Sequence, residues 1–195
     1  WSSTARIVKL SSLDARRDAD DAVGAWHARS EAALRTSGVP FTIVQPAGFM
    51  SNALAWARGI KTEGVVKAST GDGKVAMIDP ADIADVCVAA LVRDDLAGAT
   101  IPITGPAALD YRTMVGILGR AIGKKLDFVP IGDVEAKQRL LAFGRSEPVA
   151  DALVALWKAV REGKVDVVTN AVEGVLGRPA RSFEQWAKEN AAAFV

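Results

Sequence analysis

Short runs of β-branched and apolar residues alternate with segments of helical periodicity in the first third of the chain. This alternation constrains the fold more than any other feature. It predicts strands at residues 6–10 and 41–45, and helices at about 20–36 and 49–60. Neighbouring parallel strands need a crossover element, so this order of elements predicts a parallel sheet covered by helices on both faces. The expected fold class is α/β.

The helix at about 20–36 is predicted to place Val23, Trp26, Ala33 and Leu34 roughly on one apolar face. That face would pack on the sheet. In the same way, the segment after Asp79-Pro80 begins with a capping aspartate and an N-terminal proline. A helix is therefore expected from there to about residue 93.

The middle of the chain lacks the alternation of strands and helices seen in the first third. Residues 65–68 and 74–78 flank the turn sequence Gly71-Asp72-Gly73, which predicts a short hairpin or excursion. The strand expected at 100–103 contains a proline and is therefore assigned to a sheet edge.

The last third of the chain is predicted to be mostly helical. A helix follows Asp110, another runs from about Pro148 to Gly163, and a short strand is expected at 126–129. Ser182 and Gln185 have the spacing of a capping box, which marks the start of a final helix.

Composition excludes several function classes. The 24 Lys and Arg residues balance 23 Asp and Glu residues, so no surplus of positive charge is available for nucleic acid. No apolar stretch approaches the roughly 18 residues of a membrane helix, and the first residues do not form a signal peptide, so no membrane partner is expected. A lone cysteine, Cys87, forbids an internal disulfide and is interpreted as a core residue. A lone histidine, His27, forbids a zinc site built on two histidines. No metal site is expected, and the expected compartment is the reducing cytoplasm.

The candidate site lies where the first two strands end. In an open parallel sheet, ligands bind beyond the carboxyl ends of the strands. Taken singly, the serines and the Pro-Gly pair found there are more often turn formers than functional residues. In combination they suit a flat ring. The candidate residues are Ser11, Ser12, Pro46, Ala47, Gly48 and Phe49.

His27 is the one side chain whose ordinary pKa lies near neutrality. It forms a helical stripe with Val23 and Glu31, and the i, i+4 spacing would let Glu31 hold an imidazolium or fix the tautomer of the ring. The alternative is an exposed histidine with a partner on the helix surface. The spacing alone leaves both interpretations open.

Several motifs, in a fixed order, together carry a family resemblance. They are Ser11-Ser12, residues 27–34, residues 38–52, residues 79–84, Ile103-Thr104-Gly105-Pro106, and Gly177-Arg178-Pro179 followed by residues 182–186. These segments resemble atypical short-chain dehydrogenases, and the NmrA-like branch fits best. The resemblance covers nearly the whole chain.

The resemblance implies a domain organisation. Residues 1–105 would be the C-terminal half of an NAD(P)-binding Rossmann domain, with an excursion at 61–78, and residues 106–195 a smaller, mostly helical α/β substrate region. The family's glycine-rich phosphate loop has no match here, since Gly71-Asp72-Gly73 is not followed by a helix. We therefore expect a further half-domain upstream. The choice between NAD and NADP as cofactor would lie in that half and stays open.

The resemblance also implies residue roles. Ser12 matches the serine that ends the strand beside the nicotinamide, and His27 stands where ordinary members have the lysine of Tyr-x-x-x-Lys. Val23 stands at the tyrosine position. Valine cannot shuttle a proton, so alcohol–ketone interconversion through a tyrosinate is not expected. The chain's one tyrosine, Tyr111, matches a structural position.

The expected function is hydride transfer from NAD(P)H to a small quinone- or azo-type acceptor. In this hypothesis the loop at 46–49 lines the nicotinamide, Gly48 permits its close approach, and His27 contacts the ribose or relays a proton. The alternatives are a dinucleotide-binding regulator without turnover and, more weakly, a sugar-nucleotide epimerase or reductase. The oligomeric state stays open. The residues expected to shape the acceptor pocket are Met50, Asn52 and Trp56, although Met50 and Trp56 also suit core packing.

Overall fold

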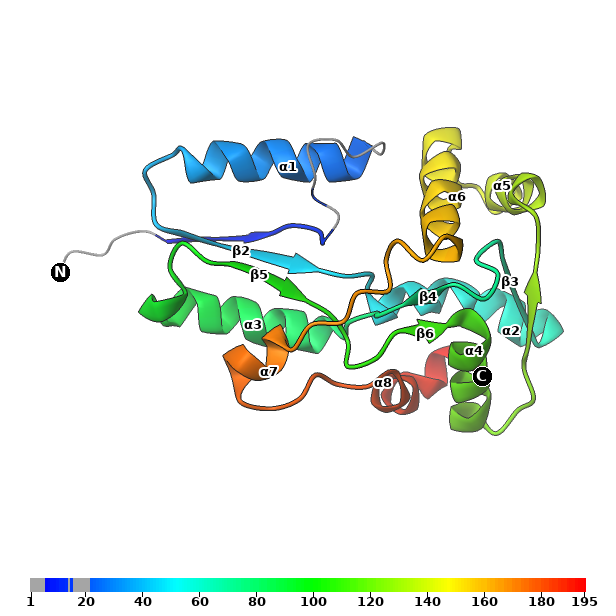
Figure 1. Ribbon diagram of the computed structural model, residues 1–195. Coiled ribbons are helices and arrows are strands. Elements are labelled where there is room, and N and C mark those ends of the chain that lie inside the picture. The colour runs from blue at the N-terminus through cyan, green and yellow to red at the C-terminus, as the bar shows by residue number, and fades with distance from the viewer. Residues whose placement is uncertain (1–5, 14, 16–21) are drawn as a thin grey trace.

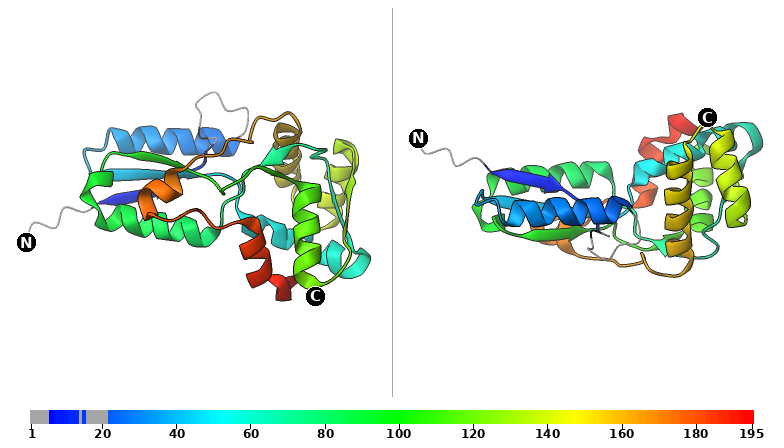
Figure 2. Two further views of the ribbon diagram at one scale, coloured as in Figure 1. Left: turned by 60° about the horizontal axis from the view of Figure 1, so that its bottom comes forward. Right: turned by 90° about the horizontal axis from the view of Figure 1, so that it is seen from above.

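A computed structural model describes residues 6–13, 15 and 22–195 of the chain. The described residues form two parts that lie end to end (Figures 1 and 2). One part holds the N-terminal strands and the helices that cover them. The other contains most of the C-terminal helices and two pairs of short strands. Among the described helices, none is both long and apolar enough to span a membrane.

The first part is built on a parallel sheet of three strands in the order β1-β2-β5. Its strands are β1 (Ile7–Leu10), β2 (Phe41–Pro46) and β5 (Thr100–Ile103), and both pairs run parallel. Helix α1 (Ala22–Arg35) covers one face and α3 (Pro80–Val92) the other (Figure 1). The prediction of an α/β fold with a parallel sheet is confirmed, and the proline-containing strand β5 lies at the sheet edge.

Of the described residues predicted to share the apolar face of α1, Leu34 is buried and Trp26 and Ala33 are not. Ala28, Glu31 and Leu34 are buried, whereas Trp26 is 55% exposed and Ala33 is exposed. The prediction that Trp26 and Ala33 pack on the sheet is therefore wrong. Spacing of three residues from position 28 to 34 selects the buried stripe, and this stripe contains a charged residue that an apolar pattern does not detect. The predicted helix start near residue 20 and the side chain of Val23 lie outside the described residues.

Helix α3 follows the sequence closely at its start. The side chain of Asp79 accepts a hydrogen bond from the Ala81 N–H, as the capping prediction requires. Cys87 is half-buried and packs against the core between α3 and the sheet, and burial raises the pKa of its thiol. Leu91, near the end of the same helix, is exposed.

The second part holds the short strands β3 (Val65–Ala68), β4 (Lys74–Val75), β6 (Leu109–Asp110) and β7 (Asp127–Pro130). Strand β3 pairs with β7 in parallel, and β4 pairs with β6 antiparallel. Of the two alternatives predicted for residues 65–78, a short hairpin or an excursion, the hairpin is therefore wrong. The turn between β3 and β4 packs instead against the end of a later helix, so closely that a Cβ on Gly73 would lie 2.1 Å from the Val160 carbonyl oxygen.

The helix expected at 49–60 consists of a 3₁₀ turn followed by a short α-helix. Asp110 accepts from the Thr113 N–H, and Ser182 with Gln185 forms the predicted capping box. The remaining helical elements are η1 (Met50–Trp56), α2 (Ala57–Glu63), η2 (Asp94–Leu96), α4 (Tyr111–Ile122), α5 (Asp133–Ala142), α6 (Glu147–Arg161), α7 (Ala171–Leu176), α8 (Phe183–Glu189) and η3 (Ala191–Phe194).

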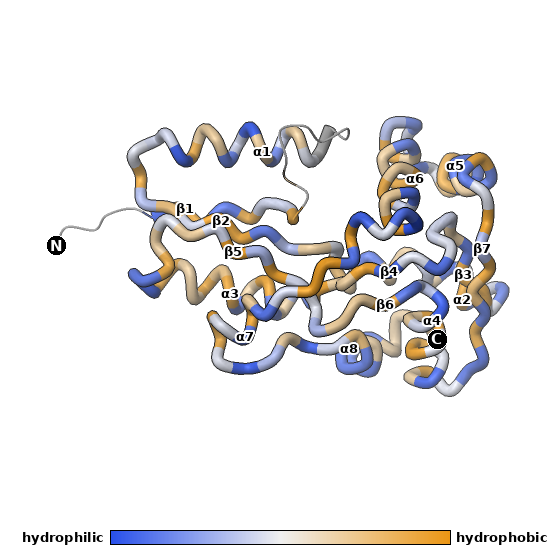
Figure 3. Tube along the Cα trace, in the orientation of Figure 1, coloured by the Kyte–Doolittle hydropathy of each residue, from blue (hydrophilic) through white to orange (hydrophobic). Residues whose placement is uncertain are grey.

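Two apolar clusters stabilise the two parts. One lies between the three-stranded sheet and α3, and it includes Val44, Val86 and Ile103. The other surrounds α4, whose Met114 and Leu118 are fully buried. Hydrophobic and hydrophilic residues alternate along α4 and α6, as expected for helices with one buried face (Figure 3).

Four charged residues tie the segment between α7 and α8 to the start of α3. Asp82 is fully buried, and its two oxygens accept from Arg178 Nη1 at 2.7 Å and from the Arg181 backbone N–H at 2.6 Å. The Arg181 Nε–H donates to Asp79 at 2.8 Å. We call Asp79, Asp82, Arg178 and Arg181 the Asp–Arg clasp. It connects the C-terminal stretch of the chain to the N-terminal part.

Candidate functional site

The loops that follow β1 and β2 meet at one edge of the sheet. The Ser11 N–H donates to the Val44 carbonyl at 2.7 Å, and the Leu13 N–H donates to the Pro46 carbonyl at 3.0 Å. These bonds extend the pairing of the two strands into their loops. The structure therefore brings Ser11 and Ser12 together with the loop at 46–49, as the parallel arrangement predicted.

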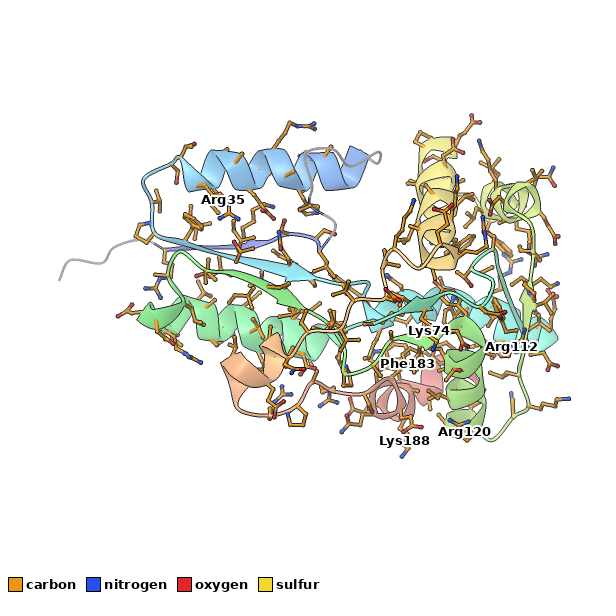
Figure 4. All side chains as sticks on the ribbon, viewed as in Figure 1. Arg35, Lys74, Arg112, Arg120, Phe183 and Lys188 are labelled. Carbon is orange, nitrogen blue, oxygen red and sulfur yellow. The ribbon has the colours of Figure 1, made fainter. Side chains whose placement is uncertain are left out.

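A buried carboxylate fixes α1 to these strand ends. Glu31 is 6% exposed, and its Oε1 accepts from the Ser11 hydroxyl at 2.5 Å and from the Gln45 side-chain amide at 2.8 Å. Arg35, labelled in Figure 4, lies 3.5 Å from the other carboxylate oxygen. Because Ser11 follows β1 and Gln45 belongs to β2, one side chain of α1 holds both strands in register with the helix.

The pattern of i, i+4 spacing had paired Glu31 with His27. The two hydrogen bonds described for Glu31 run instead to Ser11 and to Gln45 of the sheet, and Gln45 was not among the candidate residues. An alternating strand pattern could have pointed to Gln45, because it lies two residues from Ile43 and one before the candidate loop.

His27 is half-buried on α1, with a lysine from the sheet beneath it. The Lys9 ammonium lies 3.3 Å from His27 Nδ1 and 5.2 Å from the centre of the Trp26 ring. The Trp26 and His27 rings meet edge to face at 4.8 Å. Burial lowers the pKa of Lys9, while the negative charge of Glu31 acts in the opposite direction. Lys9 was missed from the sequence, although it lies two residues before Ser11 and so shares its face of the strand.

The loop at 46–49 continues beside the residues that precede α3. The Ile78 N–H donates to the Gly48 carbonyl at 2.9 Å, and the Met50 N–H donates to the Ile78 carbonyl at 2.8 Å. A Cβ on Gly48 would lie 3.8 Å from Val75 and 3.9 Å from Met77, which is ordinary contact. A small side chain at position 48 would thus point toward β4.

The residues expected to form the acceptor pocket do not surround one cavity. Met50 is buried and lines a cavity of about 260 Å³, whereas Asn52 is exposed. Trp56 is half-buried and packs on Tyr111, with ring centres 5.0 Å apart. The cavity lies between β4, α4 and α8, where Figure 4 labels Phe183 and Arg120. All three methionines of the sequence, Met50, Met77 and Met114, line it.

Tyr111 is fully enclosed in the core around α4. Burial raises the pKa of its hydroxyl to about 12, although a hydrogen bond with Trp157 acts in the opposite direction. The hydroxyl therefore stays protonated at neutral pH, which suits a structural residue. Within the described ranges, no group of three or more His, Cys, Asp or Glu side chains could hold a metal ion.

The known proteins that this chain resembles include NAD(P)H-binding proteins and reductases. The model of an NAD(P)H-binding family matches residues 3–94. The chain is 40% identical over 189 residues to a (4-alkanoyl-5-oxo-2,5-dihydrofuran-3-yl)methyl phosphate reductase of Streptomyces griseus, covering 96% of this chain and 67% of that protein. It is 35% identical over 188 residues to an NAD(P)H azoreductase of Xenophilus azovorans, covering 96% and 66%.

Solved structures show the same fold. A quinone oxidoreductase of Escherichia coli in complex with NADPH matches with a TM-score of 0.85 at 21% identity, covering 94% of this chain and 65% of that one. A triphenylmethane reductase of Citrobacter sp. in complex with NADP(H) matches with a TM-score of 0.84 at 19% identity, covering 95% and 65%. The chain thus spans about two thirds of the length of these proteins. A Rossmann-like fold follows from the structural similarity.

Proposed function

The chain belongs to the NAD(P)H-binding family, and from this premise we propose that it takes part in hydride transfer from NAD(P)H to a small quinone- or azo-type acceptor. The observation that carries the proposal is the junction of the two strand-end loops, held by Glu31, which lies one helical turn from His27 on α1. In open parallel sheets this is the edge where nucleotide ligands bind. The azoreductase and the quinone oxidoreductase among the relatives support the class of acceptor.

The residues at this edge fit a nicotinamide. Ser12 and Ala47 have small side chains and are half-buried, so a planar ring can approach the backbone of both loops. Ser12 and His27 are half-buried and supply a hydroxyl and an imidazole, which suit the hydroxyl groups of a ribose. The bound cofactor would supply the hydride. We assign Ser11, Ser12, His27 and residues 46–49 to its binding.

Transfer to a quinone or an azo group suits a site without a tyrosine. Position 23, where the resemblance places the proton-shuttling tyrosine, is valine, and Tyr111 is enclosed in the other part of the molecule. The chain would therefore orient the reacting groups and offer a hydrogen bond through His27, without tyrosinate chemistry. In the acceptor region, Met50 is buried directly after the loop at 46–49, and we assign it the role of supporting the shape of that loop. We keep Asn52 and Trp56 as candidates for contact with the acceptor.

The test uses the polypeptide that carries this sequence. Binding of NADPH and NADH is followed by cofactor fluorescence, and turnover by loss of the reduced cofactor's absorbance with quinones and azo dyes. Oxidation of the cofactor with either acceptor class supports the proposal. Tight binding without turnover across the panel would favour a regulator, and absence of binding would overturn the proposal.

A matched pair of variants on one helix tests the role of His27. His27→Ala should weaken cofactor binding or slow turnover. Arg29→Ala, at an exposed position of the same helix, should change neither. Equal behaviour of the two variants would remove His27 from the site.

A further inference from the structure

The contact between Lys9 and His27 joins a strand to a helix. Lys9 projects from β1 toward α1, and its ammonium lies 3.3 Å from one ring nitrogen of His27, Nδ1. Residues 9 and 27 are far apart in the sequence and belong to different elements, so only the packing of α1 on the sheet brings them together.

The chemistry of the two groups fixes the direction of this hydrogen bond. A lysine ammonium carries three N–H donors and no acceptor. The ring nitrogen that faces it must therefore accept, which requires an unprotonated Nδ1. In a neutral imidazole the proton then lies on the other nitrogen, Nε2.

Three further contacts hold the ammonium in this place. The Trp26 ring lies 5.2 Å from the ammonium, within the range of a cation–π interaction. The carboxylate of Glu31 attracts the positive charge of Lys9, and the Leu10 carbonyl lies 3.4 Å from the ammonium. Lys9 also starts from a strand residue that is in register with Ile43 of β2, so its backbone is fixed.

We propose that Lys9 is a positioning residue that fixes His27 as its Nε2–H tautomer. His27 then presents a hydrogen-bond donor, and the ligand atom that it contacts must be an acceptor. Resting on the proposed function, that atom is a ribose hydroxyl oxygen of the cofactor or an acceptor oxygen or nitrogen that gains negative charge on hydride transfer. While Lys9 keeps its place, neutral His27 cannot carry its proton on Nδ1, because the ammonium that faces this nitrogen has no acceptor.

The sequence makes a direct test possible, because His27 is its single histidine. Nitrogen-15 NMR of the labelled protein at neutral pH reports both ring nitrogens without overlap. We expect the pattern of the Nε2–H tautomer, with Nδ1 unprotonated. A ring that carries its proton on Nδ1, or on both nitrogens, would overturn the proposal.

Variants separate the role of Lys9 from general effects of charge. In Lys9→Met the signal of Nδ1 should move toward the protonated form, and in Lys9→Arg the wild-type pattern should return. Lys67→Met removes a lysine that pairs with Glu63 in the other part of the molecule and should leave the His27 spectrum unchanged. An unchanged spectrum in Lys9→Met would also contradict the proposal.

Turnover gives a second readout that distinguishes this inference from the proposed function. We expect kcat/KM to fall by about tenfold in Lys9→Met and to recover in Lys9→Arg, because a hydrogen bond with a charged partner is lost and then restored. If the protein binds no NADPH but the NMR results hold, the tautomer assignment stands and the ligand assignment fails. If turnover is present but the NMR results fail, the proposed function stands and the tautomer assignment fails.

Discussion

Replacement of Glu31 by alanine tests how the candidate site is held together. The change removes an acceptor that serves Ser11 at 2.5 Å and Gln45 at 2.8 Å, and Ser11 is itself buried. Each hydrogen bond to a charged group contributes about 1.5–3 kcal/mol. The contact with the exposed Arg35 adds at most about 0.5 kcal/mol. Removing Glu31 also removes the cost of burying its charge, so we expect the free energy of unfolding to fall by about 3 kcal/mol.

Urea unfolding followed by tryptophan fluorescence measures this loss, since the chain has five tryptophans. For a chain of this length the midpoint of thermal unfolding should fall by roughly 6–12 °C. Glu31→Gln keeps an oxygen for Ser11 and should cost about 1–2 kcal/mol. Glu63→Ala is the matched control, because Glu63 accepts from Lys67 at 2.8 Å on the surface and its loss should have little effect.

A loss in Glu31→Ala no greater than that in Glu63→Ala would refute the reasoning. It would mean that the strand ends and α1 keep their arrangement without the carboxylate. A loss of the expected size together with weakened cofactor binding would show that the same side chain supports both the fold and the site.

Three other changes have defined outcomes. Arg178→Met leaves the fully buried Asp82 with one donor and should lower the free energy of unfolding by about 3 kcal/mol, whereas Arg120→Met, on an exposed pair, should not change it in urea titrations. The pKa of Tyr111 rises to about 12 in the folded state, so stability should be full below pH about 10 and decline by roughly 2–3 kcal/mol as the pH rises to about 12. Tyr111→Phe should remove that decline, and tyrosinate absorbance from the folded protein near pH 10 would contradict it. Gly48→Ala should preserve cofactor affinity and stability, because a Cβ at position 48 makes only ordinary contact with Val75 and Met77. Gly48→Val should lower the free energy of unfolding in urea by about 1–3 kcal/mol through contact with β4. A loss from alanine as large as that from valine would show that the side chain at position 48 does not point toward β4.

Local patterns predicted the elements of this chain well, because caps and periodicity act within a few residues. Asp79 and the box at 182–185 cap their helices as predicted. Strand pairing was predicted less well. Residues 65–68 pair with 127–130, and nothing local to either segment selects the other as its partner. A turn sequence suggested a hairpin, but the turn is held by packing against α6.

The candidate site shows the same division. Parallel order was enough to predict that Ser11 and the loop at 46–49 would meet. Helical spacing alone could not predict that Glu31 would face Ser11 and Gln45, because the direction of α1 relative to the sheet depends on tertiary packing. Lys9 was not predicted as a site residue, because it is a charged residue within a short apolar strand. A charged residue within an apolar strand is easily passed over unless the face that it shares with Ser11 is considered.

The Asp–Arg clasp also has a consequence for the order in which the chain folds during synthesis. Asp82 is fully buried by the finished fold, but Arg178 and the Arg181 N–H are made almost one hundred residues later. Until they leave the ribosome, the first part can close only by burying an unpaired carboxylate or by keeping the start of α3 open to water. Final closure of the N-terminal part therefore waits until residues 178–181 have been synthesised, and a chain that stops before residue 178 should be cleaved faster by proteases.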